Sequence, residues 1–104
     1  PEMSHDRADV LVLTARASLA LGQTDAAVAA AAPAARRWQA LDADNRSAGL
    51  AWLWLARALA VKGPQSDADS ALREAARVLE AAGLSSDKLL LRQTQQAAMS
   101  ALTR

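Results

Sequence analysis

The segment that decides the fold runs from Leu50 to Gly63 and reads LAWLWLARALAVKG. Its leucines and alanines are strong helix formers, and the Gly63-Pro64 pair ends the run. Trp52, Leu55 and Leu59 recur three and four residues apart, which places them on one face of a helix. The segment therefore predicts a long helix, apolar on nearly all sides and packed between neighbours.

A second copy of this pattern lies earlier in the chain. The stretch from Thr14 to Gly22 (TARASLALG) aligns without a gap to the stretch from Leu55 to Gly63 (LARALAVKG), at an offset of 41 residues. A fixed period of helix pairs is typical of stacked helical hairpins. The offset predicts a single domain over residues 1–104, composed of hairpins at about 6–41 and 46–82 and a closing helix at about 88–103.

Caps and glycines between the apolar stretches predict where the helices end. Pro33 lies inside the second helix, where its missing N–H and its ring predict a kink or a split near Ala32. The expected helices run from Ser4–Asp6 to Leu21, from Thr24 or Asp25 to Leu41, from the Asp42–Asn45 cap to Lys62, and from Asp67 to Ala82. A fifth helix, capped by Ser85–Asp87, is expected from Lys88 to Thr103.

The composition favours an all-α fold. Hydrophobic residues make up 52% of the chain, alanine alone fills more than a quarter of the positions, and tyrosine and phenylalanine are absent. Alanine loses no side-chain entropy in a helix and lets facing backbones approach closely. We therefore expect tightly packed helices and no β-sheet.

The charge pattern argues against nucleic-acid and membrane partners. Twelve basic and eleven acidic residues are interspersed, which leaves no polybasic patch to displace counterions from nucleic acid and no strongly basic helix face for a membrane surface. The longest apolar run, 50–61, is too short to span a bilayer and contains Arg57, and no basic-then-apolar leader precedes it. We expect a cytoplasmic protein.

The motif of the third helix resembles that of a known repeat family. Trp52-x-x-Leu55-Ala56-x-x-Leu59, followed after the turn by Ala71-x-x-x-Ala75, is similar to the tetratricopeptide repeat. The resemblance implies a right-handed stack of antiparallel helical hairpins, a tetratricopeptide-like α-solenoid of about five helices. It also implies a concave groove, lined by the first helix of each pair, that receives a peptide or helix of another protein, as in scaffolds and chaperones.

The chain departs from the family pattern in several places. Ala56 replaces the usual glycine, Leu59 replaces the tyrosine, and Ala31 and Ala75 replace aromatic residues of the second helix. No proline closes either repeat, and the period exceeds the usual length. A helical bundle without repeats is the alternative architecture.

The resemblance points to a strip of candidate partner-binding residues. Arg16 and Arg57 follow the small packing residues Ala15 and Ala56 by one position, so both would face the groove as a basic pair that binds an acidic segment or a C-terminal carboxylate. Alternatively, both arginines are solvated or form intramolecular ion pairs. The strip comprises Asp9, Val12, Arg16, Leu53, Trp54 and Arg57.

The tryptophans allow different roles. Trp52 and Trp54 are two residues apart and point in nearly opposite directions on a helix, so they cannot enter the same core. Trp52 fits the hairpin core, whereas Trp54 either reaches the groove or is buried under a neighbouring repeat, the reading that a central apolar helix favours. Trp38 is either a partner anchor on the convex side or a packing residue.

No motif supports catalysis. His5 is the only histidine, and with Asp6 and Asp9 it does not make a zinc site of normal spacing or a base for a serine nucleophile. The chain has no cysteine and no glycine-rich phosphate loop. We expect a protein that is not an enzyme and that needs no metal or cofactor. A homo-oligomerisation domain, for example a homodimer, is the alternative to a module that binds another protein.

Overall fold

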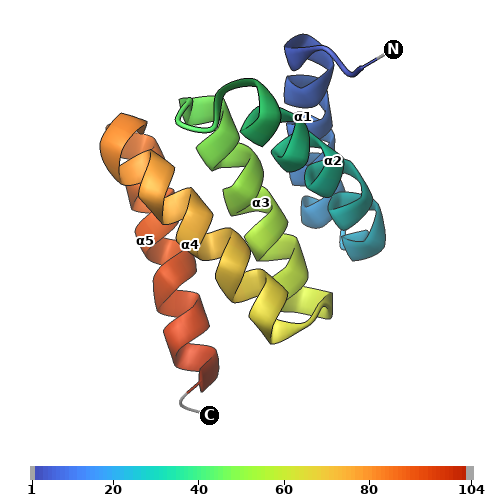
Figure 1. Cartoon of the computed structure of the whole chain (residues 1–104). Coiled ribbons are helices and arrows are strands. Elements are labelled where there is room, and N and C mark those ends of the chain that lie inside the picture. The colour runs from blue at the N-terminus through green and yellow to red at the C-terminus, as the bar shows by residue number, and fades with distance from the viewer. Residues whose placement is uncertain (1, 103–104) are drawn as a thin grey trace.

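The chain is all-helical in the computed structural model, which describes residues 2–102 (Figure 1). This part of the chain contains no strand, which confirms the predicted fold class, and none of its helices is long and apolar enough to cross a membrane. Thr103, the expected end of the last helix, lies outside the described residues. The helices are α1 (His5–Ala20), α2 (Thr24–Asp42), α3 (Arg46–Lys62), α4 (Gln65–Ala82) and α5 (Ser85–Leu102).

α1 and α3 begin where their predicted caps lie. The Ser4 hydroxyl accepts a hydrogen bond from the N–H of Arg7, and the Asn45 side chain accepts one from Ser47. The expected cap of α2 at Thr24 or Asp25 is wrong, because α2 begins at Thr24 and its N-cap, Gln23, makes no side-chain hydrogen bond. α4 starts two residues earlier than predicted because Pro64 serves as its N-cap, with its carbonyl accepting from the N–H of Ala68 at 3.1 Å. The expectation that the second helix splits at Pro33 is wrong, since α2 continues through it.

α5 begins three residues before Lys88, its expected first residue. Asp87 does not precede the helix as a cap. It lies in the first turn, where its carboxylate accepts a hydrogen bond from the backbone N–H of Leu84 at 2.8 Å. This is the arrangement in which a third-position side chain reaches back to satisfy an unpaired donor at the helix start.

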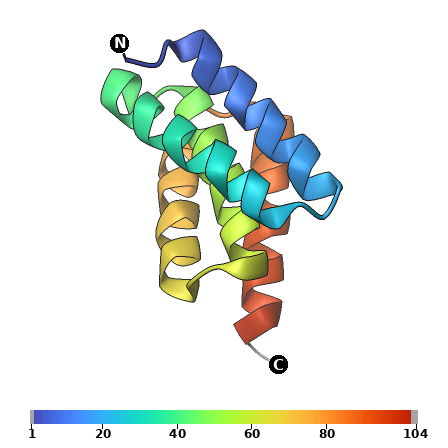
Figure 2. The same cartoon turned by 90° about the vertical axis from the view of Figure 1, so that its right-hand side faces the viewer.

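α3 is the central helix and contacts all four others. α1 pairs with α2, and α3 pairs with α4, whereas the backbones of α2 and α4 do not approach each other within 8 Å between Cα atoms. α4 and α5 also contact each other. In the view of Figure 2, α4 lies to the left of α3 and α5 to its right, with α1 and α2 crossing in front of its upper part. The odd-numbered helices α1, α3 and α5 therefore share one face of the stack.

Small residues let the helices approach closely. Ala15, Ala56 and Ala71 are almost completely buried in a cluster that joins α1, α2, α3 and α4, as their positions in the repeat predicted. Gly49 plays the same role between α3 and α4, because a β-carbon added there would lie 2.8 Å from Leu79 and 2.9 Å from Val78. A second cluster, formed by Leu53, Ala75, Leu79 and Leu91, joins α3, α4 and α5.

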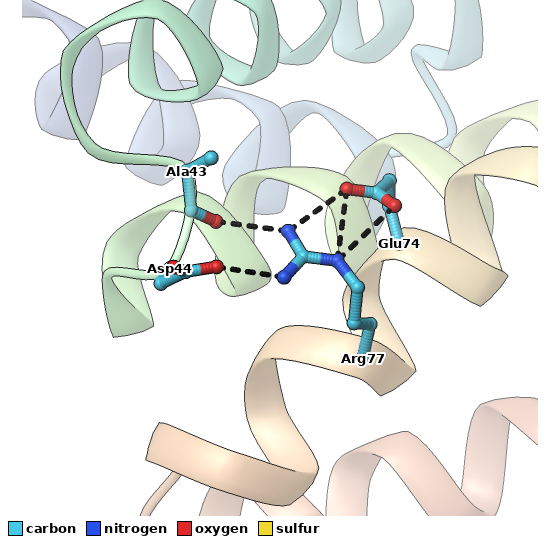
Figure 3. A network of polar contacts seen from close by, with 4 residues as sticks. All are labelled: Ala43, Asp44, Glu74 and Arg77. Atoms are coloured by element: carbon cyan, nitrogen blue, oxygen red, sulfur yellow. Dashed lines mark hydrogen bonds and ion pairs between the residues drawn. The ribbon is translucent and has the colours of Figure 1, made fainter.

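Arg77 fastens the turn between α2 and α3 to α4 (Figure 3). Its guanidinium donates to the carbonyl of Ala43 at 3.2 Å, to Asp44 at 2.7 Å and to Glu74 at 3.1 Å. These hydrogen bonds, first that of Glu74 and then that of Asp44, raise the pKa of Arg77. Exposed ion pairs add little stability, so the main consequence is geometric: the turn that leads into α3 is held in place.

Candidate functional site

A row of three adjoining hollows, which we call the groove, lies along the face formed by α1, α3 and α5. The hollows have volumes of about 430, 630 and 500 Å³. The first and second share Leu13, Arg16 and Trp54, and the second and third share Leu19 and Arg57. The groove is therefore lined by α1, α3 and the closing helix α5, with α4 contributing at the third hollow.

Trp54 and two arginines form the centre of this groove. The guanidinium carbons of Arg16 and Arg57 lie 5.1 Å and 4.9 Å from the ring centroid of Trp54, within the range of a cation–π interaction. Trp54 is half-buried against the core and lines the groove, so it is not enclosed under a neighbouring helix as its central position suggested. Arg57 also donates to the hydroxyl of Thr94 on α5 at 3.3 Å.

Neither arginine is neutralised within the described part of the chain. Between residues 2 and 102, no carboxylate lies within ion-pair distance of Arg16 or Arg57. Of the readings that the sequence left open, an intramolecular ion pair is thus excluded for this part of the chain. Each of the two cations lies on the ring of Trp54, and both line the groove.

Asp9 lies in the first hollow and has a hydrogen-bond donor from α2. The indole N–H of Trp38 donates to Asp9 Oδ1 at 3.0 Å. Trp38 itself is buried in the core cluster. It is therefore a packing residue that orients Asp9, and the alternative of a partner anchor on the convex side is wrong.

A charged pair that the sequence did not predict forms the α5 side of the groove. Arg46, the first residue of α3, donates through Nη2 to Asp87 Oδ1 at 2.9 Å and through Nε to Oδ2. The Asp87 side chain is 7% exposed and that of Arg46 is 41% exposed. The hydrogen bonds from Arg46, together with that from the Leu84 N–H, outweigh burial and lower the pKa of Asp87. The only sequence signal is that these residues lie 41 positions apart, one repeat period.

Five of the six predicted binding residues line the groove, and one does not. Asp9, Val12, Arg16 and Trp54 line the first hollow, and Arg57 lines the other two. Placing Leu53 on this strip was wrong, because its side chain is completely buried in the second core cluster. Adjacent residues on a helix point about 100° apart, so Leu53 faces α4 and α5 when Trp54 faces the groove.

The contribution of the Asp87 carboxylate to stability should depend on pH. At neutral pH, above the ordinary aspartate pKa of 3.8, the natural chain should have a larger free energy of unfolding than an Asp87→Asn variant. This difference should be lost as the pH falls through the lowered pKa of the folded protein, because protonation removes the charge that Arg46 binds. Urea unfolding of both proteins at a series of pH values measures this difference. A difference that stays constant down to the acid limit would contradict the ion pair.

The groove combines charged, aromatic and apolar groups. Among the described residues, no group of three or more histidines and carboxylates is arranged to hold a metal ion. The groove instead presents two cations on an aromatic ring, an ion pair at one wall and an apolar hollow beside α5. Comparison with family models, with curated proteins and with solved structures finds no match to the chain, so a proposal about function has to start from this groove.

Proposed function

We propose that the chain is a tetratricopeptide-like module that binds an acidic segment or a C-terminal carboxylate of a partner protein in the groove across α1, α3 and α5. It would act in the cytoplasm, as a domain of a larger regulatory protein or as a small chaperone. The observation that carries the proposal is the pair Arg16 and Arg57, which lie on Trp54 without a carboxylate partner in residues 2–102.

The surroundings of this pair favour an anionic ligand. Of the two carboxylates that line the first hollow, Asp87 is paired with Arg46, whereas Asp9 accepts a hydrogen bond from the neutral indole of Trp38 and keeps its charge. Stacking on Trp54 restricts both guanidiniums, and Arg57 is further oriented by Thr94. A carboxylate that enters the groove would meet cations whose conformational freedom is already reduced, which lowers the entropic cost of binding.

Charge reversal of the two arginines tests the proposal. Arg16→Glu and Arg57→Glu should each weaken binding of a fluorescein-labelled peptide of ten glutamates by on the order of tenfold or more, because each removes a charge-assisted contact and adds repulsion. Fluorescence anisotropy at low salt measures the affinity. Acidic peptides with free and amidated C-termini, compared in the same assay, distinguish recognition of side chains from recognition of the terminal carboxylate.

Arg73→Glu is the matched control. Arg73 is exposed on α4 and lies outside the three hollows of the groove. Its substitution by glutamate changes the net charge by the same amount as the two groove substitutions. It should leave the affinity nearly unchanged. Equal losses for all three variants would show a nonspecific charge effect, and no loss for the groove variants would refute the proposal.

Self-association is the second candidate function. Large apolar side chains are exposed on both end helices, Val10 and Leu13 on α1 and Leu89 and Met99 on α5. Exposed apolar side chains of this kind can pack against a second copy of the chain in a symmetric interface. Light scattering at several concentrations separates the two functions, since a monomer at every concentration would eliminate a homodimer.

A further inference from the structure

α5 is attached to the stack by few buried groups. Within the described part of the chain, its buried residues are Asp87, Leu91 and Thr94, and two of these three are polar. No residue of the helix between positions 95 and 101 is buried. That half of α5 and the facing ends of α3 and α4 enclose the hollow of about 500 Å³ instead of closing upon each other.

The contacts that dock α5 are the same contacts that shape the groove. At the start of the helix, Asp87 binds Arg46 of α3, and both residues line the first hollow. Further along, Thr94 accepts from Arg57, whose guanidinium lies on Trp54. Leu91 supplies the apolar contact between these two polar ones, in the cluster with Leu53 and Leu79.

The Arg46–Asp87 pair is suited to a contact that opens as a unit. When α5 leaves the stack, both charges regain water and Asp87 can still accept from the N–H of Leu84 in its own helix turn. Removing only one partner, in contrast, leaves the other without its bidentate contact in a partly buried site, which is strongly unfavourable for docking. The regions of a protein that open most easily are those with few buried apolar contacts, and this describes α5.

We propose that the Arg46–Asp87 pair is the latch that docks α5, and that docking of α5 regulates the groove by completing its wall and orienting Arg57; the regulatory half rests on the function proposed above. A ligand that contacts α1, α3 and α5 together binds the docked state more tightly. By thermodynamic reciprocity, the bound ligand also makes the opening of α5 rarer.

Hydrogen exchange of the full chain, followed by mass spectrometry without ligand, tests the latch. Asp87→Asn and Arg46→Gln should each raise the exchange rate of the α5 amides by on the order of tenfold or more, with much smaller changes in α1 to α4. The control is Asp25→Asn, which removes the exposed ion pair between Asp25 of α2 and Lys62 of α3 and should change nothing. An unchanged α5, or equal acceleration of all five helices, would overturn the latch.

The double variant Arg46→Gln/Asp87→Asn tests the regulatory half, because it removes the latch without altering the net charge of the groove. The labelled glutamate peptide should bind this variant on the order of tenfold more weakly than it binds the natural chain. The peptide should also slow exchange of α5 in the natural chain. Equal affinities, together with a faster-exchanging α5, would overturn the regulation while leaving the latch. Absence of binding to the natural chain would instead refute the proposed function and the regulation that rests on it.

Discussion

Replacing Leu53 with alanine is expected to lower the free energy of unfolding by about 2–5 kcal/mol. The leucine side chain is completely buried and joins three helices through its cluster with Ala75, Leu79 and Leu91. Its neighbours Leu79 and Leu91 are themselves buried and fixed by close packing, so they can fill only part of the space that it leaves. A small domain has only about 5–15 kcal/mol of stability in total, so the loss should be visible as a large shift of the urea midpoint.

Val61→Ala is the control for this variant, since it removes methyl groups from the same helix at a position that is 66% exposed. We expect its stability to stay within about 0.5 kcal/mol of the natural chain. Far-UV circular dichroism during urea unfolding measures both variants. If the two substitutions had equal and small effects, Leu53 would not be the core residue that the structure describes, and its original placement in the groove would have to be reconsidered.

The helices were predictable because their signals are local. Ser4 and Asn45 cap helices through side-chain oxygens that bond backbone N–H groups two or three residues away, so the sequence alone carries the information. The start of α4 was missed because its N-cap, Pro64, makes no side-chain hydrogen bond there. For α5, the predicted cap residue Asp87 lies inside the helix and reaches back to Leu84, and only the fold shows that direction.

The candidate site was predictable in part, for a different reason. The repeat offset placed Arg16 and Arg57 at equivalent positions, and the structure brings both to the same tryptophan ring. The rotation of α3 about its axis was not predictable, because a helix that is apolar on nearly all sides gives no signal that Leu53 rather than Trp54 enters the core. Arg46 and Asp87 meet only through the stacking of α5 on α3, which local patterns do not encode.

Enlarging Gly49 should be the second severe change. Leucine at this position is expected to cost about 3 kcal/mol of stability or more, because its first side-chain carbon already meets Leu79 at 2.8 Å and Val78 at 2.9 Å. Both contacted residues are buried, so neither can move aside without disturbing the cluster that joins α3, α4 and α5. The same substitution at Ala60, an exposed position of the same helix, should change the stability by no more than about 0.5 kcal/mol.

Alanine at position 49 separates the two effects that oppose each other here. Gly→Ala inside a helix ordinarily stabilises by about 1 kcal/mol, because glycine loses more backbone entropy on folding. The clash of the added carbon with two buried side chains costs about 1–3 kcal/mol, so the net change should be destabilising or close to zero. Urea unfolding of the Gly49→Ala and Gly49→Leu variants measures both changes in the free energy of unfolding and shows which of the two effects is larger. A net gain approaching the full helical preference would mean that α3 and α4 can move apart at no cost, and that the close approach at Gly49 does not hold them together.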